Sequence, residues 1–562
     1  MKHHILIVLA VIVALLVLSS GSRGQSKEQR RRTLELVTQT HYRPTFSVIA
    51  AKLITGIDTT AAYTELDSLL NSGYGDMFWM YGCTGLYFTC KDILPASYLE
   101  RIRWCWKHQT PYRGDTDNHF LMYYSSLLLF AEQWDSLPAS EWFMGRSSKE
   151  IRKEATEWIE HWIHETVLKG HNEFDSPRYL YYYLTPLLLL HCYATDTVIR
   201  HDAKVVFEMM LAQYAVLSLD GAYVGAHSRQ SNDAALRPKA GEVISYWEYF
   251  FTDTLIHRLP DVAFAAASPY KLPEYIKALA VPLQEPYEVF QTERTRKRLR
   301  IETPPIKPVK KYTYLTPDYA LGSIEGGLVQ PIQQQSWSLV LRSDSAYSTI
   351  IGLHPHYSAN ELATFFPEEP SFQLEKIEGV KRGFASEEKW LGYSPYETIW
   401  QRKNQLKCSY DIPASAPYRH VDLFFPDWGK IHDCDSTIWK RFVIDYDSVI
   451  VSLTSMTDFS ITKEPGGYRI RLSLARGKTI YWLSVRSNKK IVHSDYDPVM
   501  FSGADIYSTD TFNGWRITAP MLQWQLGKTE GVIKDANNVA TAIALSKPPK
   551  KKQTPAKAIK KK

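Results

Sequence analysis

Residues 150–167 read EIRKEATEWIEHWIHETV, and this segment shows the period of the first half of the chain. Its apolar residues recur close to every 3.6 positions, the spacing of a helix with one buried face. They are Ile151, Ala155, Trp158, Ile159 and Trp162. Further helix-length segments, including 121–130 and 184–192, alternate with short loops from residue 28 to about 285. Repeated helix pairs of this kind predict an α/α toroid, an incomplete barrel of paired helices.

From Tyr312 onward the pattern changes to alternating strands. Residues 337–342, 437–444 and 447–453 each place apolar side chains at every second position. Residues 468–474 and 479–485 flank Arg476-Gly477, which predicts a hairpin. Many such strands predict an antiparallel β-sandwich. The expected fold is therefore an α+β multidomain protein in which the toroid comes first.

Composition shifts divide the chain into five expected parts. Residues 291–311 are rich in Arg and Lys and contain three prolines, which is typical of a linker. The expected divisions are a signal peptide at 1–24, a toroid catalytic domain at 25–290, the linker at 291–311, the β-sandwich at 312–546 and a disordered Lys-rich tail at 547–562.

The N-terminus has the pattern of an export signal. Lys2 precedes the apolar run Ile5–Leu18, and small residues follow up to Ser22. The run is short for a membrane-spanning helix, and no other segment is long and apolar enough to span a bilayer. We expect a periplasmic or secreted protein without stable membrane insertion after cleavage.

The net charge of +6 is misleading because the charges are unevenly placed. The last 16 residues hold eight lysines and no acid, and residues 1–24 add two basic groups, so the remainder carries −4. This balance excludes a basic nucleic-acid-binding body. The 16 Trp and 35 Tyr favour a glycan site, although large helical cores also use many aromatic residues.

The six cysteines include no C-x-x-C pair, so a Cys-rich zinc site is not expected. Cys83 and Cys90 lie seven residues apart on one helix face. We expect buried free thiols and no cofactor, with a structural divalent metal left open.

The segment 113–124, RGDTDNHFLMYY, is the first candidate for chemistry. Asp115 and Asp117 predict a helix cap, which places Asn118 and His119 in the first helical turn. An amide and an imidazole there can bind a carboxylate or take a proton. Tyr123, further along the helix, is a candidate substrate contact. The alternative is that Asn118 and His119 only satisfy the helix end.

The segment 169–183, KGHNEFDSPRYLYYY, is the second candidate. Ser176 followed by Pro177 predicts a helix start, with Tyr179 in its first turn. The positive end of the helix dipole favours a phenolate at Tyr179. Asn172 and Glu173 are candidate substrate contacts. For residues 181–183 we expect an aromatic core stripe.

Two further loops contain histidines. Gly225–Arg229 presents His227 and Arg229, which suit an anionic substrate, although a salt bridge from Arg229 to Asp233 or Glu242 is an equal alternative. His354 and His356 follow a sandwich strand and point the same way, and His356 is a candidate substrate contact. Two histidines without a third ligand are weak evidence for zinc, and surface or packing roles are favoured.

The second candidate segment resembles a known family. Gly170-His171-Asn172-Glu173 followed by Ser176-Pro177-Arg178-Tyr179 is similar to the G-x-x-x-E-x-SP-x-Y stretch of the heparinase II/III-like polysaccharide lyases, with one extra residue before Ser-Pro. Asn118-His119 resembles the family's Asn-His helix start. The order of signal, toroid and sandwich also resembles the wider toroid lyases, including alginate lyases.

The resemblance implies roles for particular residues. Asn118, with His119, would neutralise a uronate carboxylate, and Tyr179 would be the catalytic acid and a candidate base. His354 or His356 would stand where the family has a sandwich-domain His, but the His-x-His-x-Asp pattern is not reproduced, since Ser358 follows Tyr357. The base is therefore left open among His119, His227 and a sandwich-domain His.

The implied reaction is β-elimination on a uronic-acid polysaccharide, carried out on an anionic polymer or oligosaccharide. The C5 proton is acidic only when the adjacent carboxylate is neutralised, for which Asn118, His119 and Arg229 have suitable chemistry. One alternative is an inverting glycoside hydrolase on a toroid, using Glu173 and an Asp. The second alternative is a non-catalytic glycan-binding protein.

Overall fold

The computed structural model describes residues 25–40, 45–72, 75–109, 112–252, 255, 257, 262–280, 284–295, 308–325, 329–365, 384–432, 440–474, 477–487, 512, 514–535 and 538–546. The expected signal peptide at 1–24, the tail at 547–562 and most of the expected linker lie outside these residues. Among the described residues, none of the helices has the length and apolar character needed to cross a bilayer.

The N-terminal half of the chain is helical, as the 3.6-residue pattern predicts. The helix expected around residues 150–167 is α8, whose Ser147 and Glu150 form a reciprocal N-terminal capping box. The helices of this half are α2 (Lys27–Thr38), α3 (Phe46–Thr55), α4 (Thr59–Asn71), α5 (Met77–Cys90), α6 (Ala96–His108), α7 (Asp117–Gln133), α8 (Ser148–Lys169), α9 (Tyr181–Tyr193), α10 (Thr197–Val216), α11 (Asn232–Leu236), α12 (Ile244–Phe251), α13 (Ala263–Ala267) and α14 (Glu274–Lys277). A short pair, β1 (Ser218–Leu219) and β2 (Ala222–Tyr223), follows α10.

The C-terminal half forms two antiparallel sheets. The larger has the order β14-β15-β10-β7-β6-β5-β4-β3-β17-β18-β19-β20, and the smaller has the order β11-β12-β13-β16-β9-β8. The strands are β3 (Tyr287–Glu293), β4 (Val309–Leu315), β5 (Tyr319–Glu325), β6 (Trp337–Leu341), β7 (Thr349–Leu353), β8 (Glu397–Arg402), β9 (Gln405–Asp411), β10 (His420–Pro426), β11 (Lys430–His432), β12 (Lys440–Asp445), β13 (Val449–Ser455), β14 (Phe459–Glu464), β15 (Gly467–Ser473), β16 (Lys478–Ser487), β17 (Trp515–Ala519), β18 (Leu522–Gln525), β19 (Glu530–Lys534) and β20 (Ala540–Ala544), with helix α15 (Ala359–Phe365) after β7.

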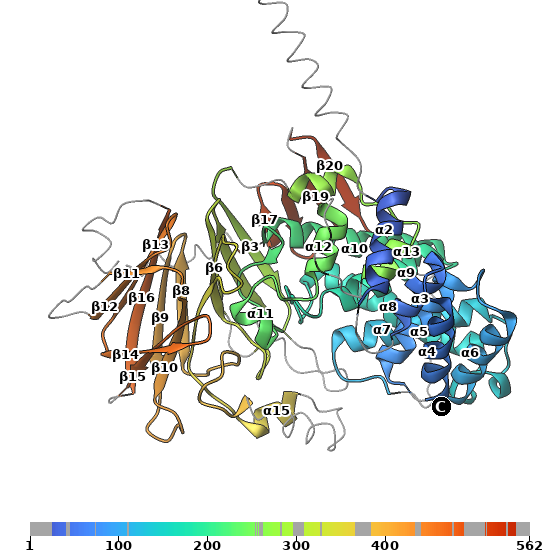
Figure 1. Ribbon diagram of the computed structural model, residues 1–562, viewed down its shortest axis with the longest axis horizontal. Helices are drawn as coiled ribbons and strands as arrows, with labels where there is room; N and C mark the ends of the chain where they lie inside the picture. Colours follow the sequence, from blue (N-terminus) through green and yellow to red (C-terminus); the bar gives the residue numbers. More distant parts are fainter. Residues whose placement is uncertain are drawn as a thin grey trace, which may run out of the picture.

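The two sheets share a core, and the larger sheet shares a second core with the helices. Leu339 of β6 and Leu483 of β16 are buried in the first. Val289 of β3 and Trp524 of β18 are buried with the helices in the second. Figure 1 shows helices α2 to α10 gathered on the right of the view and strands β8 to β16 on the left, with β3 and β6 between them.

Two features differ from the sequence-based expectations. Residues 468–474 and 479–485 contribute to β15 and β16, but these strands belong to different sheets, so the predicted hairpin is wrong. Strands β3 and β4 also extend into the segment expected to be a linker, and they pair along seven residues, with Gln291 opposite Lys311.

The five described cysteines, at 83, 90, 105, 192 and 408, are free thiols; Cys434 lies outside the described residues.

A buried ion pair joins the helical half to the larger sheet. The Lys311 ammonium of β4 contacts the Asp175 carboxylate, and both side chains are fully buried. Gln291 of β3 donates to the same carboxylate oxygen at 3.0 Å. Burial by itself raises the pKa of Asp175, but the adjacent ammonium and these hydrogen bonds outweigh it and lower the pKa to about 2. Asp175 is therefore ionised and depends on Lys311 for charge balance.

We predict that Lys311→Met lowers the free energy of unfolding by about 3–5 kcal/mol, because it leaves the Asp175 carboxylate buried without its cation. Urea unfolding followed by circular dichroism measures the change. Lys310→Met is the matched control, since the neighbouring lysine is partly exposed, and it should cost less than about 1 kcal/mol. Equal unfolding midpoints for the two variants would contradict the buried pair.

Candidate functional site

Three helix starts and one loop meet around the motif residues. Asp76 caps α5 through the backbone N–H groups of Phe78 and Trp79. Helix α7 begins after Thr116, so Asn118 and His119 lie in its first turn as predicted. Ser176 accepts the backbone N–H of Tyr179 at 2.9 Å, but residues 177–180 form turns and regular helix α9 begins only at Tyr181.

Glu173 lies at the centre of this region and is almost completely buried. Its carboxylate accepts the backbone N–H of Asn118 at 3.1 Å and the Asn118 side-chain amide at 2.5 Å. The Tyr183 hydroxyl donates to the same oxygen, and the Arg229 guanidinium forms an ion pair with the other. Four hydrogen bonds from three residues thus surround one carboxylate.

The surrounding groups keep Glu173 ionised. Burial alone raises its pKa, but the charge of Arg229 and the hydrogen bonds from Tyr183 and Asn118 outweigh burial and lower the pKa to about 2. Glu173 in turn raises the pKa of Arg229, against the opposing effect of burial. The pair therefore stays charged across the physiological pH range.

Tyr179 joins this cluster through Arg229. The guanidinium carbon of Arg229 lies 3.8 Å from the centre of the Tyr179 ring, a close cation–π contact. Tyr179 and His119 are both partly exposed, whereas Asn118 and Glu173 are buried. We call Glu173, Asn118, His119, Tyr179, Tyr183 and Arg229 the Glu173 cluster.

The hydrogen bonds of Asn118 differ from those expected of a substrate contact. Its amide N–H groups donate to Glu173 and, at 3.0 Å, to the Thr116 hydroxyl, and the side chain is fully buried. Among the described residues, its amide oxygen and the buried amide oxygen of Asn172 have no hydrogen-bond partner. Asn118 therefore holds Glu173 in place.

The candidate residues Tyr123 and His227 lie apart from the Glu173 cluster. Tyr123 is buried and packs edge-on against Tyr124 and Phe143, because it projects from a different face of α7 than Asn118. His227 is buried, and its Nδ1 contacts the backbone carbonyl oxygen of Asp175. Burial lowers the pKa of His227 to about 3, so its imidazole is neutral.

The histidines of the sheet half have local partners. His356 Nε2 lies 3.2 Å from Glu361 at the start of α15, beyond the end of β7. His354 is buried between the Ser394 hydroxyl, 2.9 Å from its Nδ1, and the Tyr418 carbonyl, 3.1 Å from its Nε2. Within the described part of the chain, no group of three or more His, Cys, Asp or Glu side chains is arranged to hold a metal.

Sequence reasoning missed two members of the site. Tyr183 was expected to be core, and it is buried, but its hydroxyl donates to Glu173. The available signal was its position four residues after Tyr179 in the helix expected to start at Ser176. Glu293 accepts the backbone N–H of His171 at 3.0 Å and pairs with the fully buried Arg516 at 3.2 Å. Burial raises the pKa of Glu293 to about 7. No local pattern marks these long-range contacts.

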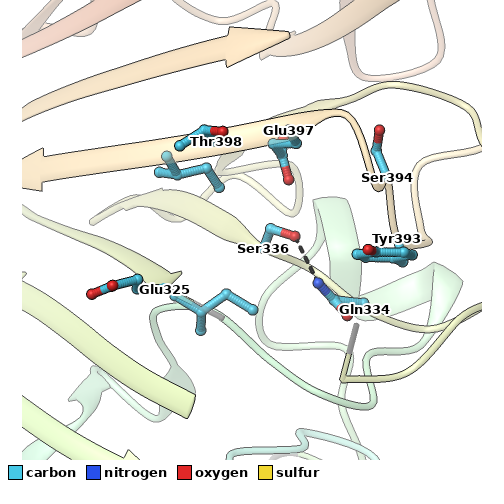
Figure 2. Close-up of a pocket in the computed structure, with 9 residues that line it drawn as sticks. Glu325, Gln334, Ser336, Tyr393, Ser394, Glu397 and Thr398 are labelled. Atoms are coloured by element: carbon cyan, nitrogen blue, oxygen red, sulfur yellow. Dashed lines mark hydrogen bonds between the residues drawn. The ribbon is translucent and has the colours of Figure 1, made fainter. Parts of the chain in front are cut away.

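A second polar region lies behind the Arg229 loop. A cavity of about 100 Å³ is lined by residues that include Glu397, Ser394, Tyr393, Gln334 and Ser336. Figure 2 shows Glu397 and Ser394 on one side of it and Gln334 and Ser336 on the other. The segment 333–336 separates this cavity from the loop, since backbone N–H groups at 227 and 230 donate to carbonyls at 335 and 333. Burial raises the pKa of Glu397 to about 7.

Comparison with known proteins finds a similarity in structure but none in sequence. No family model matches the chain, and no curated protein matches it. A search of solved structures finds a similarity to a crystal structure of heparinase III, with a TM-score of 0.41 and 8% sequence identity over 89% of this chain and 82% of that one. The candidate site is therefore defined by the contacts around Glu173.

We predict that Glu173 makes the free energy of unfolding depend on pH in the acidic range. A carboxyl group whose pKa is lower in the folded state contributes stability that is present above the unfolded pKa, about 4.3, and is lost as the pH falls toward 2. The contribution of Glu173 is on the order of 3 kcal/mol. Unfolding free energies of wild type and Glu173→Gln, measured between pH 7 and pH 2.5, should converge as the pH falls. A constant difference across this range would show that Glu173 does not titrate as described.

Proposed function

We propose that the chain is a polysaccharide lyase that cleaves a uronic-acid-containing polymer by β-elimination. The reaction needs a cation for the sugar carboxylate, a base for the C5 proton and an acid for the leaving O4. The Glu173 cluster contains a guanidinium, an imidazole and a phenol of suitable types. This combination favours elimination over the other candidate reactions.

The contact between Arg229 and Tyr179 is the observation that carries the proposal. When Tyr179 gives its proton to O4, a phenolate is left whose ring centre lies 3.8 Å from the guanidinium carbon of Arg229, and this cation stabilises it. We assign the substrate carboxylate to the Arg229 guanidinium, whose buried Nε has no hydrogen-bond partner among the described residues.

In the proposed mechanism His119 takes the C5 proton. The imidazolium that results lies near Glu173, whose negative charge stabilises it. Each charge produced in the reaction thus has an opposite charge beside it. We assign the base to His119 and not to His227, because His227 is buried against the backbone of Asp175. Asn118 is a positioning residue that orients Glu173.

The carboxylates needed by an inverting glycoside hydrolase are already committed elsewhere. A catalytic acid needs a raised pKa, whereas ion pairing lowers the pKa of both Glu173 and Asp175 to about 2. Asp117 is paired with Arg294. These contacts favour the lyase over the hydrolase.

The proposal includes the wider expectations from the sequence. We propose that the helices form an incomplete α/α toroid and the sheets a sandwich. We also propose that the protein is exported to the periplasm or beyond and acts on an anionic polysaccharide or oligosaccharide without a cofactor.

We predict that the purified protein raises absorbance near 232 nm (roughly, the unsaturated uronate product) on at least one of heparan, alginate, ulvan and glucuronan. Tyr179→Phe should lower kcat about 10²- to 10⁴-fold, because it removes the proton donor and keeps the ring on Arg229. Tyr193→Phe, at the far end of the helix that follows Tyr179, is the matched control and should retain activity.

Two results would redirect the assignment. Release of reducing ends without absorbance at 232 nm, with loss of activity in Glu173→Gln and tolerance of Tyr179→Phe, would identify a hydrolase. Oligosaccharide binding without either product would identify a glycan-binding protein.

A further inference from the structure

Four aromatic rings that are only partly buried touch one another at the helix starts. The Phe78 ring of α5 lies 5.3 Å from His119 and 5.0 Å from Tyr182, in both cases edge to face. The Tyr182 ring lies 6.2 Å from Tyr179. All four rings retain exposed surface. We call these four residues the aromatic wall.

The side chains next to the aromatic wall are buried, so the partial exposure of the wall is confined to its own rings. Met77 and Trp79 on either side of Phe78 are buried, as are Tyr181 and Tyr183 on either side of Tyr182. In their first turns the two helices thus bury their other apolar side chains and expose ring surface beside His119 and Tyr179. Contiguous exposed rings next to a buried charge cluster are typical of a ligand site.

We propose that Phe78 and Tyr182 form a stacking subsite for a sugar ring of the polymer, adjacent to the ring that is cleaved. This inference rests on the proposed function, since it takes the Glu173 cluster as the place where cleavage occurs. Phe78 and Tyr182 act in binding, while His119 and Tyr179 act in the chemistry.

The chemistry of the wall matches a uronate polymer. A pyranose ring presents a face of C–H groups, and an aromatic ring offers an apolar face for it. None of the four residues is acidic, and the guanidinium carbons of Arg229 and Arg178 lie 3.8 Å and 5.8 Å from the centre of the Tyr179 ring. Each arginine also pairs with one carboxylate, Arg229 with Glu173 and Arg178 with Glu242 at 3.5 Å. The wall therefore contributes contact area while the arginines contribute attraction for carboxylates.

The test removes the flat ring and keeps the apolar packing. Phe78→Leu and Tyr182→Leu are compared with the rescue variants Phe78→Tyr and Tyr182→Phe, which keep an aromatic face. Trp104→Leu is the matched control, because Trp104 on α6 is 57% exposed and stacks on His108. Each variant is first checked for an unchanged thermal unfolding midpoint.

Binding is measured separately from turnover by placing each variant in the Tyr179→Phe background. The probes are hexasaccharides of heparan, alginate, ulvan and glucuronan. Isothermal titration calorimetry measures the dissociation constant of each probe. We expect each Leu variant to weaken binding about tenfold or more, and the rescue and Trp104→Leu variants to bind as the background does. In the active enzyme the same Leu changes should raise KM and leave kcat within about threefold.

The outcomes separate the two proposals. Retained binding and KM in both Leu variants overturn the stacking subsite and leave the lyase in place. Loss of kcat without a change in KM also overturns it, because it assigns the rings to positioning of the catalytic groups. Failure of the parent protein to bind or cleave any of the four polymers overturns the proposed function itself.

Discussion

The buried pair of Lys311 and Asp175 is the constraint on which the site depends. Both side chains are fully buried, so each charge requires the other. Asp175 also has a left-handed backbone, with φ of 50°, in the loop between α8 and α9. Because Lys311 and Gln291 face each other across β4 and β3, two strands hold this one carboxylate. The loop that contains Glu173 is thereby attached to the sheet.

The loop between α8 and α9 is attached to the sheet through Asp175, and Glu173 on its other side remains for the candidate site. Asp175 and Glu173 are two residues apart and have different partners: the first contacts the sheet, and the second contacts the starts of α7 and α9. Gly170, at the head of the loop, has φ of 79°, and a Cβ there would collide with Glu293. Close approach of loop and strand thus explains both the glycine and the fixed direction of Glu173.

Local patterns predicted much of this arrangement, and non-local contacts account for what they missed. The apolar period found α8, and the motif from Gly170 to Tyr179 located the cluster. Lys311 was placed in a linker, because its partner lies 136 residues away and leaves no trace in neighbouring residues. The hairpin predicted around Gly477 failed for the same reason, since turn signals do not show which sheet each strand joins. Tyr123 lies apart from the Glu173 cluster because residues that are close in sequence, such as Asn118 and Tyr123, can lie on different faces of one helix.

The same contacts imply that the two halves of the chain form one site. Arg229 belongs to a loop whose backbone pairs with residues 333–335 of the sheet half, and its guanidinium completes the charge of Glu173 in the helical half. Separating the halves would leave Asp175, on the helical side, as a buried carboxyl without its cation Lys311. The free energy cost of such a charge, about 3–5 kcal/mol, is a substantial fraction of the stability of a typical domain, about 5–15 kcal/mol. The geometry between Tyr179 and Arg229 is therefore maintained by interactions that lie on the sheet side of the loop.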